Sequence, residues 1–356
     1  MPNRDRELSE PIKVAQVAPS IFPVPPLNHG GTERVIHDLS VGLRDLGCEV
    51  TLFAPSDSAC PVPRIGSLPS LQFLEKKYGS VPPSLPSVLE TVRMEEVRGL
   101  LATFDVVHFH GEFFHAVTLG ENRRRSLTTI HWRVDELDRE LFFSAFQDLP
   151  VAAISKSQEA ALPVANRAGV VLHGVDPARF EPNLAPEPYL AFIGRMTDQK
   201  RPDVAIRVAQ AAGRPIRLAG TIDVGNPLYF DTYVRPHLSA DAAYVGPVDD
   251  AAKNDLLRGA SALLFPIDWP EPFGLVMIEA MACGTPVIAW NRGSVPEVVE
   301  HGVTGFIVET EAEAISALSR IDELDRSVIR ARFEARFTAD RMAQDYLDIY
   351  RRLLQR

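Results

Sequence analysis

Strand-like and helix-like segments alternate along almost the whole chain, and this alternation restricts its possible folds more than any other feature. Short apolar runs that predict buried strands are separated by longer segments with helical periodicity. The pattern is typical of parallel sheets covered by helices, because consecutive parallel strands need a crossover between them. In the first half, strands are predicted at 12–18, 49–54, 106–109, 126–131, 151–154 and 170–172, and a helix at 32–46.

A second series of alternating segments follows a polar, proline-rich stretch at 181–188, which predicts a linker. A chain of 356 residues is long enough for two domains. We therefore expect an α/β protein with two Rossmann-like domains, 1–182 and 186–336, which face each other across a cleft. Apolar residues at helical spacing predict a last helix at 339–354. In the second series, strands are predicted at 189–193, 216–219, 244–246, 262–265, 286–289 and 306–308.

Two glutamates, Glu271 and Glu279, stand eight residues apart around the start of a predicted helix. Pro272 suits a first helical turn, and Gly284 can end the helix in the left-handed conformation. On one continuous helix the two carboxylates would lie roughly 12 Å apart along the axis. The unpaired amides at a helix start attract a diphosphate. The spacing therefore fits a nucleotide-diphospho-sugar, with a sugar hydroxyl at Glu271 and a ribose hydroxyl at Glu279.

A structural interpretation of the two glutamates stands beside this one. Helices are rich in glutamate, so most such pairs are ordinary surface residues. Here the residues around Glu279 are apolar on nearly every side, which predicts a buried helix. A buried glutamate needs a partner or a ligand. Separate salt links for Glu271 and Glu279, or positions far from any opening between the domains, would contradict the ligand interpretation.

The run 271–287 closely resembles the E-x7-E signature of the retaining glycosyltransferases of family 4. The similarity continues through 293–299 and 302–306, and it covers most of the C-terminal half of the chain. The resemblance implies the two-domain GT-B fold. In that fold the last helix, here within 337–356, packs back on the first domain.

The same resemblance implies roles for individual residues. In family 4 the first glutamate binds the donor sugar and the second binds the ribose, which implies these roles for Glu271 and Glu279. Backbone amides after the first glutamate hold phosphate and sugar in that family. Farther along, Ser294 and Glu297 form a capping-box pattern that predicts a short helix. The donor-binding residues assigned to this half of the chain include Gly246, Glu271, Phe273, Gly274, Leu275, Val276 and Glu279.

A second candidate segment, 192–202, leaves a predicted strand, turns and enters a helix. Gly194 lets the backbone approach a ligand closely, and Arg195 and Lys200 offer positive charge to phosphate oxygens. Surface arginines and lysines are usually just solvated, so these residues alone do not decide the matter. The segment also resembles the G-R-x4-K motif of family 4. That resemblance implies that Arg195 and Lys200 hold the donor diphosphate.

Gly30 and Gly31 follow the first predicted strand, at the start of a helix. Backbone amides there could contact a phosphate or a sugar, but a turn that needs positive φ explains the two glycines equally well. The chain has no G-x-G-x-x-G dinucleotide pattern. Similarity to the Gly-Gly loop of family 4 implies that Gly30 and Gly31 lie on the donor-phosphate side of the cleft.

Three histidines, His108, His110 and His131, lie at the ends of predicted strands, where α/β proteins gather their sites. His108 and His110 flank Phe109, and we expect their side chains on opposite faces of the strand, so that they do not line one pocket. A third ligand at suitable spacing for a metal is missing. His131 matches the family position that contacts the donor sugar near its 6-hydroxyl. His110 is a second candidate, with a core or loop role as the alternative.

The segment at Asp176 resembles the N-G-V-D sequence that closes the first domain in family 4, although His173 replaces the usual asparagine. This similarity indicates a hinge and cleft wall. Asp176, together with His110 and Trp132, is therefore assigned to the acceptor side or the wall of the cleft.

Bulk properties exclude several classes of protein. The formal net charge of −10 argues against a nucleic-acid partner. The chain starts with a polar segment unlike a signal peptide, and no stretch approaches the roughly 20 apolar residues of a membrane span. The 3 cysteines are odd in number and lack metal-type spacing, which favours a reducing cytoplasm. We expect a cytoplasmic protein with at most a peripheral membrane association.

These observations predict a glycosyltransferase that moves a hexose from a nucleotide-diphospho-sugar to a hydroxyl-bearing small molecule or glycan. His131, Glu271, Arg195 and Lys200 are the predicted catalytic residues. The chain has no Asp-x-Asp, the pattern by which many other glycosyltransferases hold a metal, and its cations could neutralise the leaving group. We therefore expect a metal-independent enzyme without a cofactor, and the resemblance implies retention of configuration. UDP-glucose or another UDP-hexose is the first expected donor and GDP-mannose the second; an epimerase or a non-catalytic sugar-nucleotide sensor are the alternatives.

Overall fold

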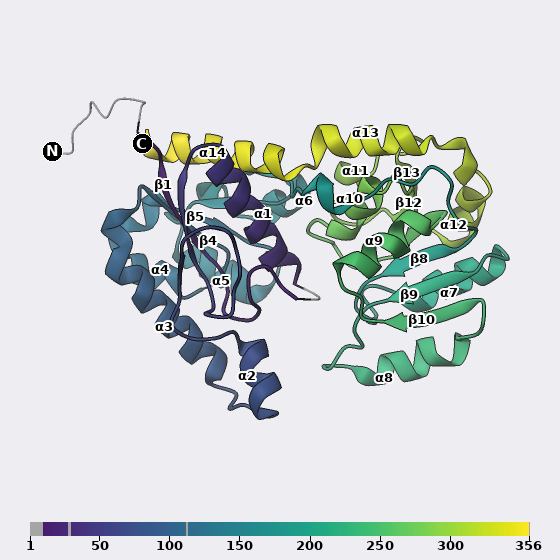
Figure 1. Cartoon of the computed structure of the whole chain (residues 1–356), viewed down its shortest axis with the longest axis horizontal. Helices are drawn as coiled ribbons and strands as arrows, with labels where there is room; N and C mark the ends of the chain where they lie inside the picture. Colours follow the sequence, from purple (N-terminus) through teal and green to yellow (C-terminus); the bar gives the residue numbers. More distant parts are fainter. Residues whose placement is uncertain (1–9, 28–29, 112, 356) are drawn as a thin grey trace. The chain divides into compact units, whose positions relative to one another are not determined.

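The computed structural model describes residues 10–27, 30–111 and 113–355, so the polar start of the chain lies outside the described residues. Two compact units are present (Figure 1). Their bounds are Met1–Ile154, Glu159–Val171 and Ala339–Arg356 for unit 1, and Ser155–Gln158 and Leu172–Thr338 for unit 2. Within the described ranges, no helix combines the length and apolarity that a membrane crossing requires.

Unit 1 contains a sheet of seven parallel strands in the order β3-β2-β1-β4-β5-β6-β7. Its central strands are almost fully buried, as expected for a sheet covered by helices. The strands are β1 Lys13–Val17, β2 Glu49–Phe53, β3 Arg64–Ile65, β4 Val106–Phe109, β5 Ser126–Thr129, β6 Val151–Ala153 and β7 Arg167–Val170.

Helices cover both sides of this sheet (Figure 1). The last helix, α14, packs against α1, and a Cβ on Gly42 of α1 would lie only 2.7 Å from the Cβ of Ala343. The predicted return of the last helix to the first unit is therefore confirmed. The helices here are α1 Gly31–Asp45, α2 Leu71–Tyr78, α3 Leu85–Leu100, α4 His115–Leu119, α5 Leu137–Ala145, α6 Lys156–Ala161 and α14 Ala339–Leu354.

Unit 2 contains a sheet of six parallel strands in the order β10-β9-β8-β11-β12-β13. The strands are β8 Leu190–Ile193, β9 Ile216–Ala219, β10 Ala242–Gly246, β11 Ala262–Phe265, β12 Val287–Trp290 and β13 Gly305–Val308. The helices are α7 Pro202–Ala211, α8 Pro227–Tyr229, α9 Asp250–Gly259, α10 Leu275–Ala282, α11 Val295–Val298, α12 Glu311–Leu318 and α13 Arg326–Arg336.

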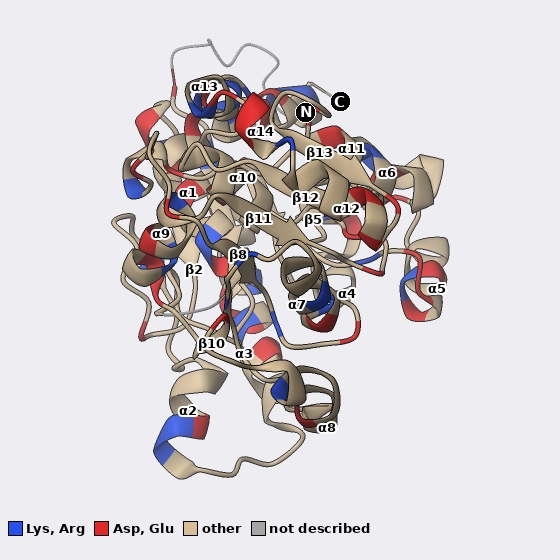
Figure 2. Cartoon of the chain, turned by 90° about the vertical axis from the view of Figure 1, so that its right-hand side faces the viewer, with Lys and Arg blue, Asp and Glu red and all other residues tan. Residues whose placement is uncertain are grey.

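The α/β class and the two parallel sheets agree with the sequence-based expectation. Figure 2 shows acidic and basic residues mixed along helices such as α5 and α13, in a chain of net charge −10. One strand differs from its prediction, because β7 ends where the strand expected at 170–172 begins. The residues of β7 are only half-buried, so in the sequence the apolar run at 170–172 gave a stronger indication of a strand.

Candidate functional site

Helix α10 begins at Leu275, four residues later than the position of Glu271. Gly274 precedes it with φ +79°, and a Cβ there would lie 2.8 Å from the Met277 methyl carbon. Pro272 therefore lies in the loop before the helix, which corrects its predicted place in the first turn. Glu271 is in the same loop, so the estimate of roughly 12 Å for one continuous helix does not apply. The predicted left-handed end is confirmed, because Gly284 has φ +73°.

The loop that carries Glu271 is held by Gly293 and Ser294. The Ser294 amide donates to the Glu271 carbonyl at 3.0 Å, and the Ser294 hydroxyl donates to the Phe273 carbonyl at 2.9 Å. A Cβ on Gly293, whose φ is +55°, would collide with the Glu271 backbone. The capping-box prediction for Ser294 is wrong, since its side chain makes no capping hydrogen bond to α11. The hydroxyl is used to fix the Glu271 loop instead.

Glu271 forms an ion pair with Lys200, 71 positions earlier in the chain. Both side chains are largely buried, with exposed fractions of 9% and 16%. The indole N–H of Trp269 donates to the same carboxylate oxygen at 2.9 Å, and the Lys200 ammonium lies 5.1 Å from the Trp269 ring centre. Two predicted catalytic residues therefore meet directly. Trp269 is a partner that sequence reasoning missed, although it stands only two residues before Glu271.

Glu279 has its own cation, because Lys253 of α9 reaches its carboxylate at 2.5 Å. The two glutamates are thus in separate salt links, the arrangement that the sequence analysis named as contrary to a ligand role. Burial alone no longer demands a ligand, since each carboxylate is neutralised within the chain. The observation that still favours a ligand is the position of Glu271 and Lys200 beside the start of α10. Nothing in the sequence pattern pointed to Lys253.

Three more predicted donor-binding residues lie at the carboxyl ends of β8 and β10, which β9 separates. Ligands bind at this edge in open α/β sheets. Gly194 follows β8, and its amide donates to the carbonyl of Ala219 at 3.0 Å. Gly246 ends β10 with φ +82°. Arg195 is half-exposed, and its guanidinium lies 3.9 Å from Asp223. This cation can therefore turn toward a bound anion at little cost.

Two of the predicted residues have structural contacts of their own. The ring of Phe273 is buried and packs edge-on against His173, with 5.0 Å between ring centres. The carboxylate of Asp176 accepts from the amide of Ala178 at 2.9 Å and so closes a local turn. The half-exposed Trp132 belongs to unit 1.

The histidines of unit 1 overturn one expectation. The rings of His108 and His110 lie 4.1 Å apart, so the two side chains share one face of β4. Side chains alternate along a strand, and residues two apart therefore point to the same side. The expectation of opposite faces is wrong for this reason.

These rings belong to a chain of buried hydrogen bonds that ends at His131. The Gln16 amide donates to the Tyr350 hydroxyl at 2.9 Å, so its carbonyl oxygen accepts from Nε2 of His110 at 2.7 Å. Nδ1 of His110 then accepts from Nε2 of His131 at 2.9 Å. Tyr350 also bonds Nδ1 of His108 at 2.7 Å. The C-terminal helix thereby selects the tautomer of His131, and burial lowers the pKa of His131 to about 3.

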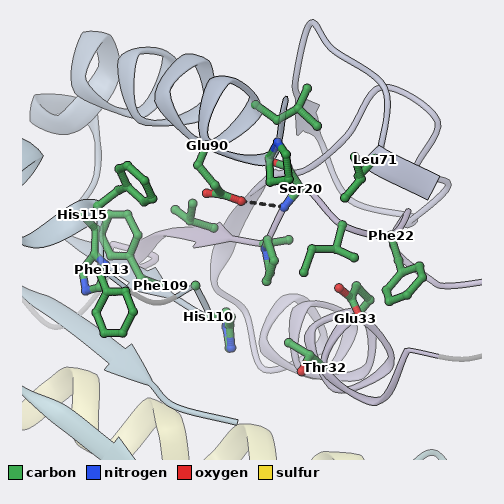
Figure 3. A pocket seen from close by; sticks show the side chains of 18 of the residues that line it. Ser20, Phe22, Thr32, Glu33, Leu71, Glu90, Phe109, His110, Phe113 and His115 are labelled. Carbon is green, nitrogen blue, oxygen red and sulfur yellow. Dashed lines mark hydrogen bonds between the residues drawn. The ribbon is translucent and has the colours of Figure 1, made fainter. Parts of the chain in front are cut away.

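A pocket of about 530 Å³ opens in unit 1 at the carboxyl ends of β1 and β4 (Figure 3). Its lining includes Gly30, Gly31, His110 and Trp132, which the sequence analysis predicted to lie near a substrate. The carboxyl group of Glu33, in the first turn of α1, also lines it. Burial raises the pKa of Glu33 to about 7. In the described part of the chain, no group of three or more His, Cys, Asp or Glu residues is arranged to hold a metal ion.

Two family models match the chain, one in each half. Residues 29–179 match "Glycosyltransferase Family 4", and residues 176–331 match "Glycosyl transferases group 1". A curated D-inositol 3-phosphate glycosyltransferase of Mycobacterium bovis is 31% identical over 203 residues, which cover 48% of this chain and 42% of that protein. The chain thus spans less than half the length of the curated relatives it matches.

Solved structures resemble the chain over nearly its whole length. AviGT4, a glycosyltransferase involved in avilamycin A biosynthesis, is 27% identical with a TM-score of 0.70, covering 97% of this chain and 98% of its own. The Anabaena protein HepE in complex with UDP-glucose is 19% identical with a TM-score of 0.72, covering 95% and 98%. Sucrose-phosphate synthase of Thermosynechococcus elongatus is 20% identical with a TM-score of 0.75, covering 97% and 99%. The two parallel-sheet units thus have the GT-B fold.

Proposed function

We propose that this chain, a GT-B glycosyltransferase of the family 4 type, transfers a hexose from a nucleotide-diphospho-sugar to a hydroxyl group with retention of configuration and without a metal ion. The observation that carries the proposal is the meeting of Lys200 and Glu271 beside the first amides of α10. Cation, carboxylate and helix start together suit a diphosphate joined to a sugar.

The chemistry would be mainly electrostatic. Negative charge grows on the diphosphate as its bond to the sugar breaks, and Lys200, Arg195 and the start of α10 are the groups that would stabilise it. On binding, a sugar hydroxyl would donate to Glu271, and Lys200 would turn from that carboxylate toward phosphate. Among the residues that the structure describes, we identify no second carboxylate for the role of covalent nucleophile, so departure and attack on the same face of the sugar are proposed. Acceptor positioning would supply the rest of the rate.

UDP-hexose, with UDP-glucose first, is the proposed donor, and GDP-mannose is the alternative. The HepE structures with UDP and UDP-glucose support a uridine nucleotide at the level of fold. Glu279, paired with Lys253, is the proposed ribose ligand. A ribose hydroxyl would add a hydrogen bond to a carboxylate that is already neutralised, so its contribution to binding is expected to be modest.

The direct test measures release of the nucleotide diphosphate from UDP-glucose, UDP-galactose and GDP-mannose, with NMR of the product at its anomeric carbon. Slow hydrolysis of one donor without acceptor, and an α-linked product from an α-linked donor, are the expected results. Isomerisation of the donor sugar without any acceptor would indicate an epimerase instead. Nucleotide-sugar binding with neither hydrolysis nor transfer would indicate a sensor.

A further inference from the structure

The pocket of unit 1 is built mostly from apolar side chains (Figure 3). They come from the carboxyl ends of β1 and β4, the loop after β4 and helix α3. Aromatic rings form one part of the wall and aliphatic groups another, as Phe109, Phe113, Leu89 and Met94 illustrate. A pocket of about 530 Å³ has room for a ligand of one or two rings.

The charged groups in the lining are mainly acidic. Glu33 and Glu90 both face the pocket, and the Glu90 carboxylate accepts a hydrogen bond from the Ser20 amide at 2.8 Å. Burial raises the pKa of each carboxyl group above its usual value. Loss of hydration is the largest cause for both, which means that the pocket is a poor place for negative charge.

The cationic and imidazole groups of the lining already have partners. Arg139, the one lysine or arginine among the described lining residues, pairs with Glu136 at 2.9 Å and Asp138 at 2.6 Å. Nε2 of His115 bonds the Thr128 hydroxyl at 2.8 Å. The cations and rings that could meet an anion are therefore held by the protein itself.

We infer that the acceptor bound in this pocket is an uncharged, hydroxylated compound with an apolar body of one or two rings. The inference rests on the proposed transfer and names the class of its acceptor. The apolar wall stabilises a ring by removing it from water, and Glu33 and Glu90 can each accept a hydrogen bond from a hydroxyl group. A phosphorylated acceptor would lose its hydration beside two acids without gaining an available cation. Gly30 and Gly31, which also line the pocket, are assigned to the donor phosphate. The chain thus differs from the curated relatives whose name specifies an inositol phosphate.

The test compares three probes on the full chain saturated with UDP: phenyl β-D-glucopyranoside, its 6-phosphate, and methyl β-D-glucopyranoside. Isothermal titration calorimetry should show that the phenyl glucoside binds about tenfold more tightly than either of the other two. Equal or tighter binding of the 6-phosphate, or no advantage of phenyl over methyl, would overturn the inference. The proposed function is judged separately by donor hydrolysis without acceptor, so the two can fail independently.

Substitutions in the pocket test whether the differences in affinity among the three probes arise there. Glu90→Gln keeps an oxygen that can accept from the Ser20 amide but removes the charge, and it should tighten binding of the 6-phosphate about fivefold while leaving the phenyl glucoside within about twofold. Leu89→Phe fills the pocket and should weaken the phenyl glucoside by at least about tenfold. Glu95→Gln, an exposed change on the same helix, is the control. Unchanged binding in both pocket variants, with thermal unfolding showing that each is folded, would also overturn the inference.

Discussion

Each of the two glutamates depends on one lysine. Glu271 and Lys200 come from loops far apart in the chain, whereas Glu279 and Lys253 come from the helices α10 and α9. A carboxylate as buried as these would be unstable in its charged form without its cation. The lysines therefore make the empty site stable, and a ligand has to compete with them. The energetic consequence is that substitutions here change stability as well as binding.

Lys200→Ala should lower kcat by about 100-fold while KM for the donor changes less than about threefold, because the charge that Lys200 would neutralise grows as the bond breaks. Steady-state kinetics with the preferred nucleotide-sugar measure both constants. Lys76→Ala, on an exposed face of α2, is the matched control and should leave both unchanged. Equal losses in kcat and in binding would show that Lys200 is only an anchor.

Glu279→Ala should weaken binding of UDP by about tenfold, since a charge-assisted hydrogen bond to the ribose would be lost. Calorimetric titration with UDP gives the dissociation constant. Glu279→Gln leaves a hydrogen-bond acceptor for the ribose and should lose less. An unchanged dissociation constant in the alanine variant would rule out the ribose role.

The sequence predicted Glu271 and Lys200 through motifs, but it did not predict their contact or the roles of Lys253 and Trp269. A motif gives the order of residues along the chain, whereas the Lys200–Glu271 and Lys253–Glu279 pairs form between segments that only the folded unit brings together. The error over His108 and His110 had another origin. The alternation rule itself places them on one face, and the rings are indeed adjacent.

Among the elements, α10 and its preceding loop show how backbone shape positions a side chain. Gly274 and Gly293 both have positive φ, and the second lies against the backbone of Glu271. Ser294 then ties the loop down through its amide and its hydroxyl. The segment 293–294 thus positions Glu271.

Gly293→Ala should destabilise the protein by about 2–3 kcal/mol and lower kcat, because a methyl group adds a collision to the strain of positive φ. Gly302→Ala is the control, since Gly302 has φ +76° and no atom within 4 Å of the added carbon. Gly302→Ala should lower the free energy of unfolding by only about 1 kcal/mol and keep full activity. Chemical denaturation and initial rates measure the two effects. Equal stability losses in both variants would mean that the Glu271 loop shifts to accommodate the added methyl group.

Strong periodic segments were predicted well at this scale. The strands β4, β9 and β11 and the helix α14 have the predicted bounds, because each is a predominantly apolar run or carries an apolar stripe. The elements β3 and α2 were not predicted. β3 has only two residues and α2 has no buried residue, so neither leaves an apolar pattern in the sequence.

For the molecule as a whole, the α/β class and the GT-B fold followed from the sequence, since two series of alternating segments and one family resemblance agreed. The acceptor did not follow. Its pocket is formed by residues from many separate segments between Val17 and Arg139, and no single motif contains them.

The free energy of unfolding should depend on pH through two buried titratable groups, a histidine with a lowered pKa and a glutamate with a raised pKa. His131 has a folded pKa of about 3, below its usual 6.5, so its contribution to stability is lost as pH falls from 6.5 toward 3. Glu33 has a folded pKa of about 7, above its usual 4.5, so its contribution is present below 4.5 and is lost as pH rises through 7. The two contributions oppose each other between pH 4.5 and 6.5.

Glu33→Gln removes the stabilising contribution that the Glu33 carboxyl group makes at low pH. The free energy of unfolding of this variant should therefore fall more steeply than that of the parent as pH drops from 6.5 to 4.5. The difference between the two proteins should amount to about 2–3 kcal/mol over this interval. Urea unfolding at several pH values measures it, and Glu75→Gln, at an exposed glutamate of α2, is the control. Parallel pH profiles for Glu33→Gln and the parent would contradict the raised pKa of Glu33.

The contribution of α14 to unit 1 also affects how the protein is made. Tyr350 supplies the hydroxyl that Gln16 and His108 need, and it stands 334 residues after Gln16 in the chain. Until α14 has been synthesised, those polar groups stay inside the first sheet without their partner. The unit whose strands are synthesised first is therefore completed only after the chain has passed through the whole of unit 2.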